Sequence, residues 1–306
     1  FAGLEGVAGG SGSNSLTGIN TNSTWTIGVA NTYAEDADLG NALAFSGIQM
    51  ATGGAGVDSF TVGDSTSLDL SGGGNNDVFS VSGNANVTGS LNGDAGNDSF
   101  TFSGAVVVPA ELDGGADTDN VSFATSILAV SINLDTFNNV ETVTGSTIND
   151  TIVGSLGNDD FTVTGTSDDG TVVSGATGVT TAFFDFENLS GAAGADTFAI
   201  VGNAVGLTGG IDGGADTDTI DYSAYTSAVG VNLATGTATN ITGGISTLEN
   251  AIGGFGADVI TGDAGNNALT GNAGNDVLSD GAGDDVLNGG DNNDTYMLTP
   301  GSADVV

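Results

Sequence analysis

Apolar residues occupy alternate positions in many short segments of this chain, and glycine-rich turns separate the segments. Examples are Phe60 and Val62, Phe79 and Val81, Phe100 and Phe102, Phe161 and Val163, and Phe198 and Ile200. Such alternation is typical of a β-strand that buries one face. Glycine and β-branched residues are too frequent throughout for a long helix. The pattern predicts an all-β protein whose phenylalanines form a ladder in the core.

Five consecutive nonapeptides fill residues 253–297. They largely follow the pattern G-G-x-G-x-D-x-U-x, where U is a large apolar residue, here Ile260, Leu269, Leu278, Leu287 and Tyr296. The array resembles the RTX, or haemolysin-type, repeat of secreted bacterial proteins. This resemblance implies a parallel β-roll whose turns hold calcium between successive coils and whose apolar position fills the core. Two nonapeptides would make one coil of 18 residues.

Degenerate copies of the motif continue upstream of this array. Their sixth positions, from Asn14 to Asp258, are separated by one or two steps of about 20 residues, a spacing that indicates a solenoid. We interpret the longer intervals as containing coils that lack the motif. The sequence therefore predicts a parallel β-solenoid (β-roll or β-helix) of about 15 coils of roughly 20 residues, continuous as one rod and ending in the RTX β-roll.

Two further repeats indicate how the solenoid is divided. Residues 113–134 match residues 212–233 almost position for position, at an offset of 99 residues. A second motif, an apolar residue followed by Glu-x-x-x-Gly, contains Glu5, Glu141, Glu187 and Glu249, each nine residues before a sixth position. We expect modules at 1–139, 140–247 and 248–306. The glutamates should face the opposite turn, continue a column of ligands, or simply be solvated.

The aspartates at the sixth position are the candidate calcium ligands. Neighbouring strands lie roughly 4.8 Å apart and calcium binds oxygen at roughly 2.4 Å, so an ion midway between two coils reaches a carboxylate from each. In the tandem array, Asp258, Asp276 and Asp294 should form one column, and Asn267 with Asp285 a weaker one. Candidates upstream are Asp58, Asp77, Asp98, Asp119, Asp150, Asp159, Asp196 and Asp218, and weaker candidates are Asp117, Asp216, Asp94, Asp263 and Glu141. Acidic turns without metal are the alternative.

The composition limits both the partners and the chemistry. The chain has 306 residues, 38 carboxylates and no Lys, Arg or His, giving a net charge of −38. Such a polyanion should bind divalent cations and avoid nucleic acid and anionic membranes. No run approaches the roughly 20 apolar residues of a membrane helix. The absence of cysteine excludes disulfides and thiol chemistry, and weak calcium sites suit an extracellular location.

These features favour a calcium-binding structural protein over an enzyme. Without His, Lys, Arg or Cys, catalysis would depend on carboxylates, hydroxyls and a bound ion, and no residue stands out as an acid or a base. We interpret the chain as a rod-like segment of a bacterial surface adhesin or matrix filament, extracellular and folded by calcium. Solenoid ends without polar caps would also permit self-association by end-to-end stacking.

Other functions remain open on the sequence. The chain would also suit a calcium-dependent glycan- or protein-binding module, or the non-catalytic RTX part of a secreted polysaccharide-active enzyme. An ice-binding face would require a regular array of threonines. Thr24 and Thr26, and then Thr162 and Thr164, are too scattered along the sequence to predict one.

Overall fold

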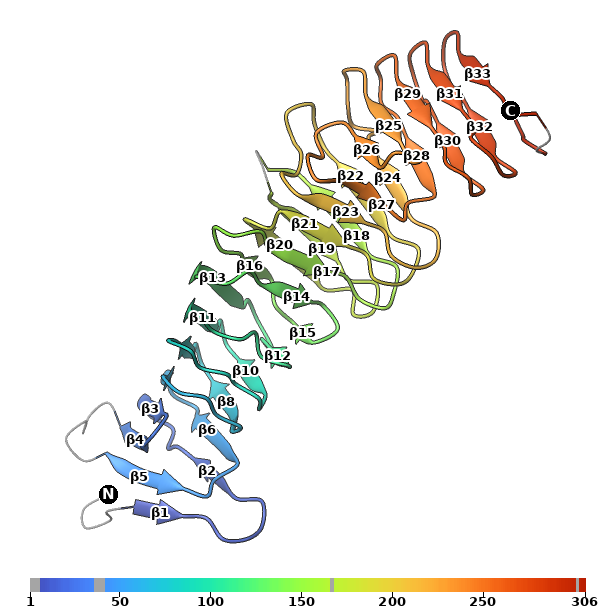
Figure 1. Cartoon of the computed structure of the whole chain (residues 1–306). Helices are drawn as coiled ribbons and strands as arrows, with labels where there is room; N and C mark the ends of the chain where they lie inside the picture. Colours follow the sequence, from blue (N-terminus) through green and yellow to red (C-terminus); the bar gives the residue numbers. More distant parts are fainter. Residues whose placement is uncertain (1–5, 36–41, 166–167, 301–302) are drawn as a thin grey trace. The chain divides into compact units, whose positions relative to one another are not determined.

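The computed structural model describes residues 6–35, 42–165, 168–300 and 303–306 (Figure 1). Every regular element in these ranges is a β-strand, so the all-β prediction is confirmed. This part of the chain contains no helix long and apolar enough to cross a membrane. The chain divides into two compact units, one formed by residues 1–132 and 136–148 and the other by residues 133–135 and 149–306. Strand β14 (Ser131–Asn133) lies where the chain passes from one unit to the other.

The strands of the first unit are short, as expected for solenoid coils. They are β1 (Gly6–Ala8), β2 (Ser15–Thr17), β3 (Ser23–Ile27), β4 (Asn31–Glu35), β5 (Leu43–Ser46), β6 (Met50–Gly54), β7 (Asp58–Val62), β8 (Asp69–Gly74), β9 (Val78–Val81), β10 (Leu91–Ala95), β11 (Ser99–Gly104), β12 (Leu112–Asp113), β13 (Asn120–Ser126), β15 (Phe137–Asn138) and β16 (Thr142–Thr144).

Successive coils of the first unit add strands to two parallel sheets. One sheet has the order β3–β7–β9–β11–β13–β16. The other has the order β2–β6–β8–β10–β12–β15. Each strand pairs with the equivalent strand of the next coil, so the expected parallel β-solenoid is confirmed.

Stacked aromatic rings form the core of the first unit. Trp25, Phe60, Phe79 and Phe100 are fully buried and follow one another along the first sheet, with ring centroids 5.5, 4.7 and 4.6 Å apart. Their spacing is set by the separation of the strands that carry them. The predicted phenylalanine ladder is therefore confirmed, and Trp25 is a core residue.

The second unit also consists of short strands. They are β17 (Thr151–Val153), β18 (Asp160–Val163), β19 (Gly170–Val173), β20 (Thr180–Phe184), β21 (Asn188–Ser190), β22 (Thr197–Ile200), β23 (Gly210–Asp212), β24 (Thr219–Asp221), β25 (Gly230–Asn232), β26 (Thr237–Ala238), β27 (Gly244–Ser246), β28 (Asn250–Ile252), β29 (Val259–Thr261), β30 (Ala268–Thr270), β31 (Val277–Ser279), β32 (Val286–Asn288) and β33 (Thr295–Met297).

Three parallel ladders organise the second unit. The longest is β18–β22–β24–β28–β30–β32. The others are β17–β21–β23–β27 and β25–β29–β31–β33. The tandem nonapeptides supply β29 to β33, and their apolar residues Ile260, Leu269, Leu278 and Leu287 are buried. One nonapeptide thus forms half of an 18-residue coil, as expected.

Some long intervals between motifs are enlarged single coils. Asp159 and Asp196 are 37 residues apart, an interval that we expected to hold two coils, yet the strands that follow them, β18 and β22, pair directly. The intervening chain forms the antiparallel strands β19 and β20 at the edge of β18. β4 and β5 form a similar antiparallel insertion beside β3. An insertion of this kind lengthens a coil without changing the register of its neighbours.

Candidate metal centre

The turns that precede the aspartates require a left-handed backbone. At the fourth position of the motif, Asn75, Asp117 and Asp216 replace glycine and have φ angles of 72°, 82° and 80°. Asn and Asp tolerate this conformation better than other side chains. The side chains of Asp117 and Asp216 are exposed, and the turn conformation alone accounts for Asp at this position.

A column of carboxylates runs along the first unit at the start of the strands. The backbone N–H groups of Asp58, Asp77 and Asp98 each donate to Oδ1 of the aspartate in the next coil, at 2.7, 2.6 and 2.7 Å. The N–H of Asp119 donates to Glu141 Oε2 at 2.7 Å. All four aspartates are buried. The glutamate of the second motif therefore continues the column one coil further.

The second unit repeats this arrangement. Asp159 N–H donates to Asp196 Oδ1 at 2.6 Å, and Asp196 N–H donates to Asp218 Oδ1 at 2.8 Å. Asp218 N–H then donates to Glu249 Oε2 at 2.9 Å. Asp150 and Glu187 form a parallel pair, in which Asp150 N–H donates to Glu187 Oε2 at 2.6 Å. Three of the four glutamates thus continue columns, and Glu5 lies outside the described residues.

The tandem array contributes both predicted columns. Asp258 N–H donates to Asp276 Oδ1 at 2.7 Å, and Asp276 N–H donates to Asp294 Oδ1 at 3.0 Å. On the other side, Asn267 N–H donates to Asp285 Oδ1 at 2.7 Å. The structure therefore stacks these five residues as the 18-residue coil requires.

Asn267 differs from the aspartates around it. Its side-chain Oδ1 accepts from the Asp263 N–H at 2.8 Å, and its Nδ2 donates to the backbone oxygen of Glu249 at 2.8 Å. Its amide is thus committed to hydrogen bonds within the protein. This observation supports the expectation that Asn267 weakens its column.

The second carboxylate oxygen of most columnar aspartates lacks a hydrogen-bond partner. These oxygens are buried Oδ2 atoms, and they belong to Asp77, Asp98, Asp119, Asp196, Asp218, Asp276 and Asp285. A buried anionic oxygen without a partner is costly unless a cation compensates it. No Lys, Arg or His exists anywhere in the sequence to do so.

The first glycine of each turn leaves room beside this oxygen. A Cβ placed on Gly72 would lie 2.2 Å from Asp77 Oδ2, and one on Gly191 would lie 2.1 Å from Asp196 Oδ2. Gly271 stands in the same relation to Asp276, at 2.3 Å. Any side chain at this position would fill the space in front of the carboxylate. The set of oxygen donors and the space beside them fit calcium, a hard cation that prefers oxygen ligands.

Burial also perturbs the acidity of these carboxyls. It raises the pKa of Asp77, Asp98 and Asp196 to about 7, and that of Asp119 and Asp218 to about 6, with neighbouring carboxylates adding to the effect and hydrogen bonds opposing it. The pKa of Asp276 and of Asp285 is raised as well, chiefly by burial. Without a cation, burial in the folded columns therefore shifts these carboxyls toward the protonated form.

Two aspartates, each the first of its column in the second unit, accept hydrogen bonds from the protein on both carboxylate oxygens. Asp159 accepts hydrogen bonds from the N–H groups of Ser155 and Gly175, both at 2.6 Å, and from the Ser155 hydroxyl. Asp258 accepts from the N–H groups of Gly254 and Val229, at 2.6 and 2.8 Å. These two carboxylates therefore stabilise their turns directly.

The weaker candidates of the second position have structural partners. Asp94 accepts from the Ser71 hydroxyl and from the Gly73 N–H of the preceding coil, at 2.5 and 3.1 Å. Asp263 accepts from the Gly265 N–H at 2.8 Å. Both carboxylates are half-buried and tie the turn together.

One cluster was not anticipated from the sequence. Asp280, Asp285 and Asp304 place carboxylate oxygens within 4.8 Å of one another, a separation that a shared cation would allow. Asp280 replaces the first glycine of its nonapeptide, and its carboxylate accepts from the N–H and hydroxyl of Thr299. The signal for this cluster in the sequence is the aspartate in place of the first glycine of the nonapeptide.

The family comparison agrees with this geometry. A family model described as the RTX calcium-binding nonapeptide repeat, in four copies, matches residues 136–169, 249–278 and 270–302. This chain carries RTX calcium-binding repeats. Calcium is accordingly the cofactor of the RTX array, and two of the matched ranges cover the tandem columns. The search of curated proteins finds no match.

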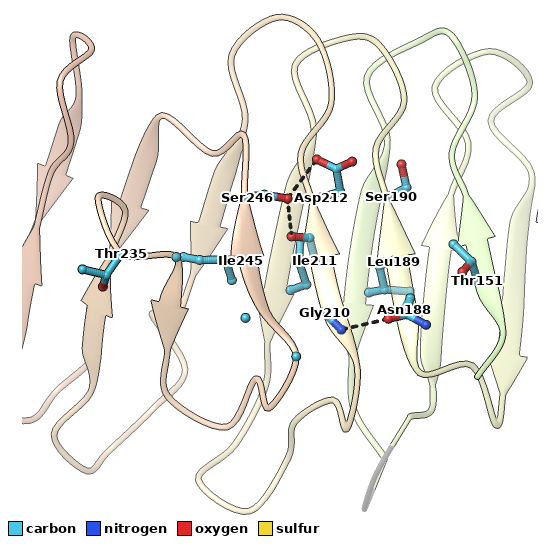
Figure 2. A pocket seen from close by; sticks show the side chains of 13 residues that line it. Thr151, Asn188, Leu189, Ser190, Gly210, Ile211, Asp212, Thr235, Ile245 and Ser246 are labelled. Atoms are coloured by element: carbon cyan, nitrogen blue, oxygen red, sulfur yellow. Dashed lines mark hydrogen bonds between the residues drawn. The ribbon is translucent and has the colours of Figure 1, made fainter. Parts of the chain in front are cut away.

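A groove in the second unit is shown in Figure 2. It has a volume of about 390 Å³ and lies over β17, β21, β23 and β27. Asp212 is the one ionisable residue among those that line it, and it accepts a hydrogen bond from the Ser246 hydroxyl at 3.1 Å. Glycoside hydrolysis requires a pair of carboxyl groups, so the groove lacks that arrangement. The RTX match is to a calcium-binding repeat, and no catalytic family was identified.

Proposed function

We propose that this chain is a calcium-stabilised, extracellular structural segment of a bacterial surface protein, such as an adhesin stalk or a matrix filament. The observation that carries the proposal is the set of buried carboxylate columns in a chain without a single basic side chain. Stacked buried anions repel one another and lose their hydration. A fold built around them needs divalent cations to be stable at neutral pH.

The proposed ligands in the first unit are Asp77, Asp98 and Asp119, and those in the second are Asp196, Asp218, Asp276 and Asp285. Each uses one carboxylate oxygen to accept the backbone N–H of the preceding coil, which fixes its orientation. The other oxygen then remains for a cation. Because these residues are far apart in sequence, the unfolded chain has no preformed site. The free energy of binding therefore becomes free energy of folding.

The extracellular location rests on the repeat and on the composition. The RTX repeat resembles that of secreted bacterial proteins, and calcium sites of extracellular modules fill at the calcium concentrations found outside cells. The chain has no cysteine, so bound ions would take the stabilising role that disulfides often have in secreted proteins. Folding after export, where calcium becomes abundant, follows from the same coupling.

The proposal is tested by surface labelling combined with protease protection. Antibodies against the folded chain should label intact cells of the source organism. A protease that cuts after apolar residues should degrade the purified chain rapidly in chelator and slowly in calcium. Labelling only after cell lysis would contradict the extracellular role, and equal degradation rates would contradict calcium-dependent folding.

A further inference from the structure

The outer surface of one sheet in the first unit consists almost entirely of hydroxyl groups. Strands β3, β7, β9, β11, β13 and β16 each place two side chains on this surface, on either side of a buried core residue. We name these twelve positions the hydroxyl face. One row contains Thr24, Ser59, Val78, Ser99, Asn120 and Thr142, and the other contains Thr26, Thr61, Ser80, Thr101, Ser122 and Thr144.

The register aligns each row from strand to strand. Thr26 pairs with Thr61, Thr61 with Ser80, and Ser80 with Thr101. Ten of the twelve residues carry a hydroxyl, Val78 and Asn120 are the exceptions, and none of the twelve is buried. Along the sequence these residues look scattered because whole coils separate them. The expectation from the sequence concerned threonines alone, and here Thr24 and Thr26 align with threonines and serines of the following coils.

The core directly behind these rows repeats regularly from strand to strand. The ring planes of Trp25 and Phe60 differ by 11°, those of Phe60 and Phe79 by 4°, and those of Phe79 and Phe100 by 9°, and the ring centroids are 5.5, 4.7 and 4.6 Å apart. The hydroxyl groups therefore repeat at the strand spacing of roughly 4.8 Å along each row, and the rows lie two residues apart.

The hydroxyl face carries no charged residue, whereas other outer surfaces of the chain do. The other sheet of the same coils presents Asp69 and Asp113 on its outer surface. In the second unit, the outer positions of β18 and β24 include Asp160 and Asp221. Strand propensity favours threonine, but it does not explain why the hydroxyl face lacks the carboxylates that these two surfaces carry.

We propose that the hydroxyl face binds the surface of a crystalline, uncharged polysaccharide. A hydroxyl group both donates and accepts hydrogen bonds, so a regular array of them matches a partner whose own hydroxyls do the same. An anionic polymer is repelled by a chain with net charge −38, and a cationic polymer would bind the carboxylate-bearing faces instead.

The rigidity of the array selects an ordered partner. Each hydroxyl exchanges water for a new hydrogen bond and contributes little by itself. Many such contacts add up only if both surfaces hold their groups in register beforehand, because ordering a flexible chain costs entropy. A soluble glycan would lose conformational entropy on binding, whereas a crystalline surface is already ordered. Binding does not depend on which residues hold calcium, provided that calcium keeps the first unit folded.

The experiment is co-sedimentation of the full chain with microcrystalline cellulose in calcium, after circular dichroism has shown that the protein is folded. The wild-type chain should bind cellulose and ignore alginate gel and soluble dextran. A variant with Thr26→Val, Thr61→Val and Thr101→Val keeps the shape of the row and removes three hydroxyls, so its affinity should fall about tenfold or more. A second variant with Thr61→Asp and Thr101→Asp adds charge to the row and should abolish binding.

Thr52→Val, on the other sheet of the same unit, is the matched control and should bind like the wild type. The proposal is overturned if the folded wild type does not bind cellulose, or if the control loses as much affinity as the triple variant. Equal binding to alginate, or adsorption to ice without retention on cellulose, would also overturn it. A chain that fails to fold in calcium would instead contradict the proposed function, so the two failures are distinguishable.

Discussion

Replacing Asp98 by Asn should change the stability of the fold in opposite directions with and without calcium. Asp98 is 2% exposed, its Oδ1 accepts the Asp77 N–H at 2.6 Å, and its Oδ2 has no partner. The asparagine can keep the first hydrogen bond through its carbonyl oxygen. The substitution therefore removes one buried negative charge and leaves the local geometry largely intact.

The magnitude in the absence of calcium follows from the acidity of this group. Burial raises the pKa of Asp98 from 3.8 to about 7, which corresponds to about 4 kcal/mol of preference for the neutral form. Screening by solvent at the turn reduces this to roughly 2–3 kcal/mol. The unpaired amide N–H of the asparagine costs roughly 1 kcal/mol. In chelator above neutral pH, Asp98→Asn should therefore stabilise the fold by about 1–2 kcal/mol.

In saturating calcium, Asp98→Asn should instead destabilise the fold. Asp98 is a proposed ligand between Asp77 and Asp119, and an uncharged amide is a poorer ligand than a carboxylate. If the neighbouring ions bind about 100-fold more weakly, the fold loses about 2.7 kcal/mol. Urea unfolding followed by circular dichroism measures both conditions. Where the chelated wild type lacks β signal, a gain of that signal in the variant serves as the readout.

Asp64→Asn is the matched control, because Asp64 is exposed and lies outside the columns. It should change stability by only a few tenths of a kcal/mol in either condition. A shift of the same sign for Asp98→Asn in calcium and in chelator would refute the reasoning. It would mean that Asp98 is a structural turn residue rather than a calcium ligand.

Three further predictions concern calcium binding at the turns, the stability contributed by the core, and the dependence of stability on pH. Gly72→Ala should weaken calcium binding at least tenfold in isothermal titration, because the new Cβ would lie 2.2 Å from Asp77 Oδ2, whereas Gly12→Ala meets no atom within 4 Å and should be neutral. Phe79→Ala should lower the free energy of unfolding in calcium by about 3–5 kcal/mol. Val78 is half exposed on the same strand, so Val78→Ala should lower it far less. Equal losses of unfolding free energy for the two variants in urea would contradict the core ladder. In chelator, the fold should be more stable at about pH 5 than at about pH 8. The buried aspartates whose pKa is raised to about 6 or 7 bind more protons in the folded state than in the unfolded state. Stability is therefore lost as the pH rises from 3.8 toward those values. A chelator-treated β signal that is independent of pH would contradict this.

The sequence predicted the fold class because the repeat places the same residue types at each turn. The apolar position of every nonapeptide and the phenylalanines after the degenerate motifs can be buried together only by stacking coils. The same periodicity stacked Asp258, Asp276 and Asp294 correctly. These features depend on spacing alone, which a single sequence contains.

The sequence did not predict features that depend on how the chain folds between two successive motifs. The 37 residues from Asp159 to Asp196 read as two coils, but strand alternation cannot distinguish a parallel coil from an antiparallel insertion. The role of Glu141 was equally undetermined, because its spacing fitted either side of the coil. The hydroxyl face could not be predicted from the sequence, because its members belong to six different coils whose register only the structure shows.

The central claim is that calcium folds this chain by neutralising its buried carboxylate columns. The most direct measurement is a calcium titration of chelator-treated protein that follows circular dichroism and hydrodynamic radius together. The account predicts a cooperative gain of β signal that coincides with compaction. A protein that is already compact and rich in β structure in excess chelator near pH 8, and that calcium does not change, would contradict it.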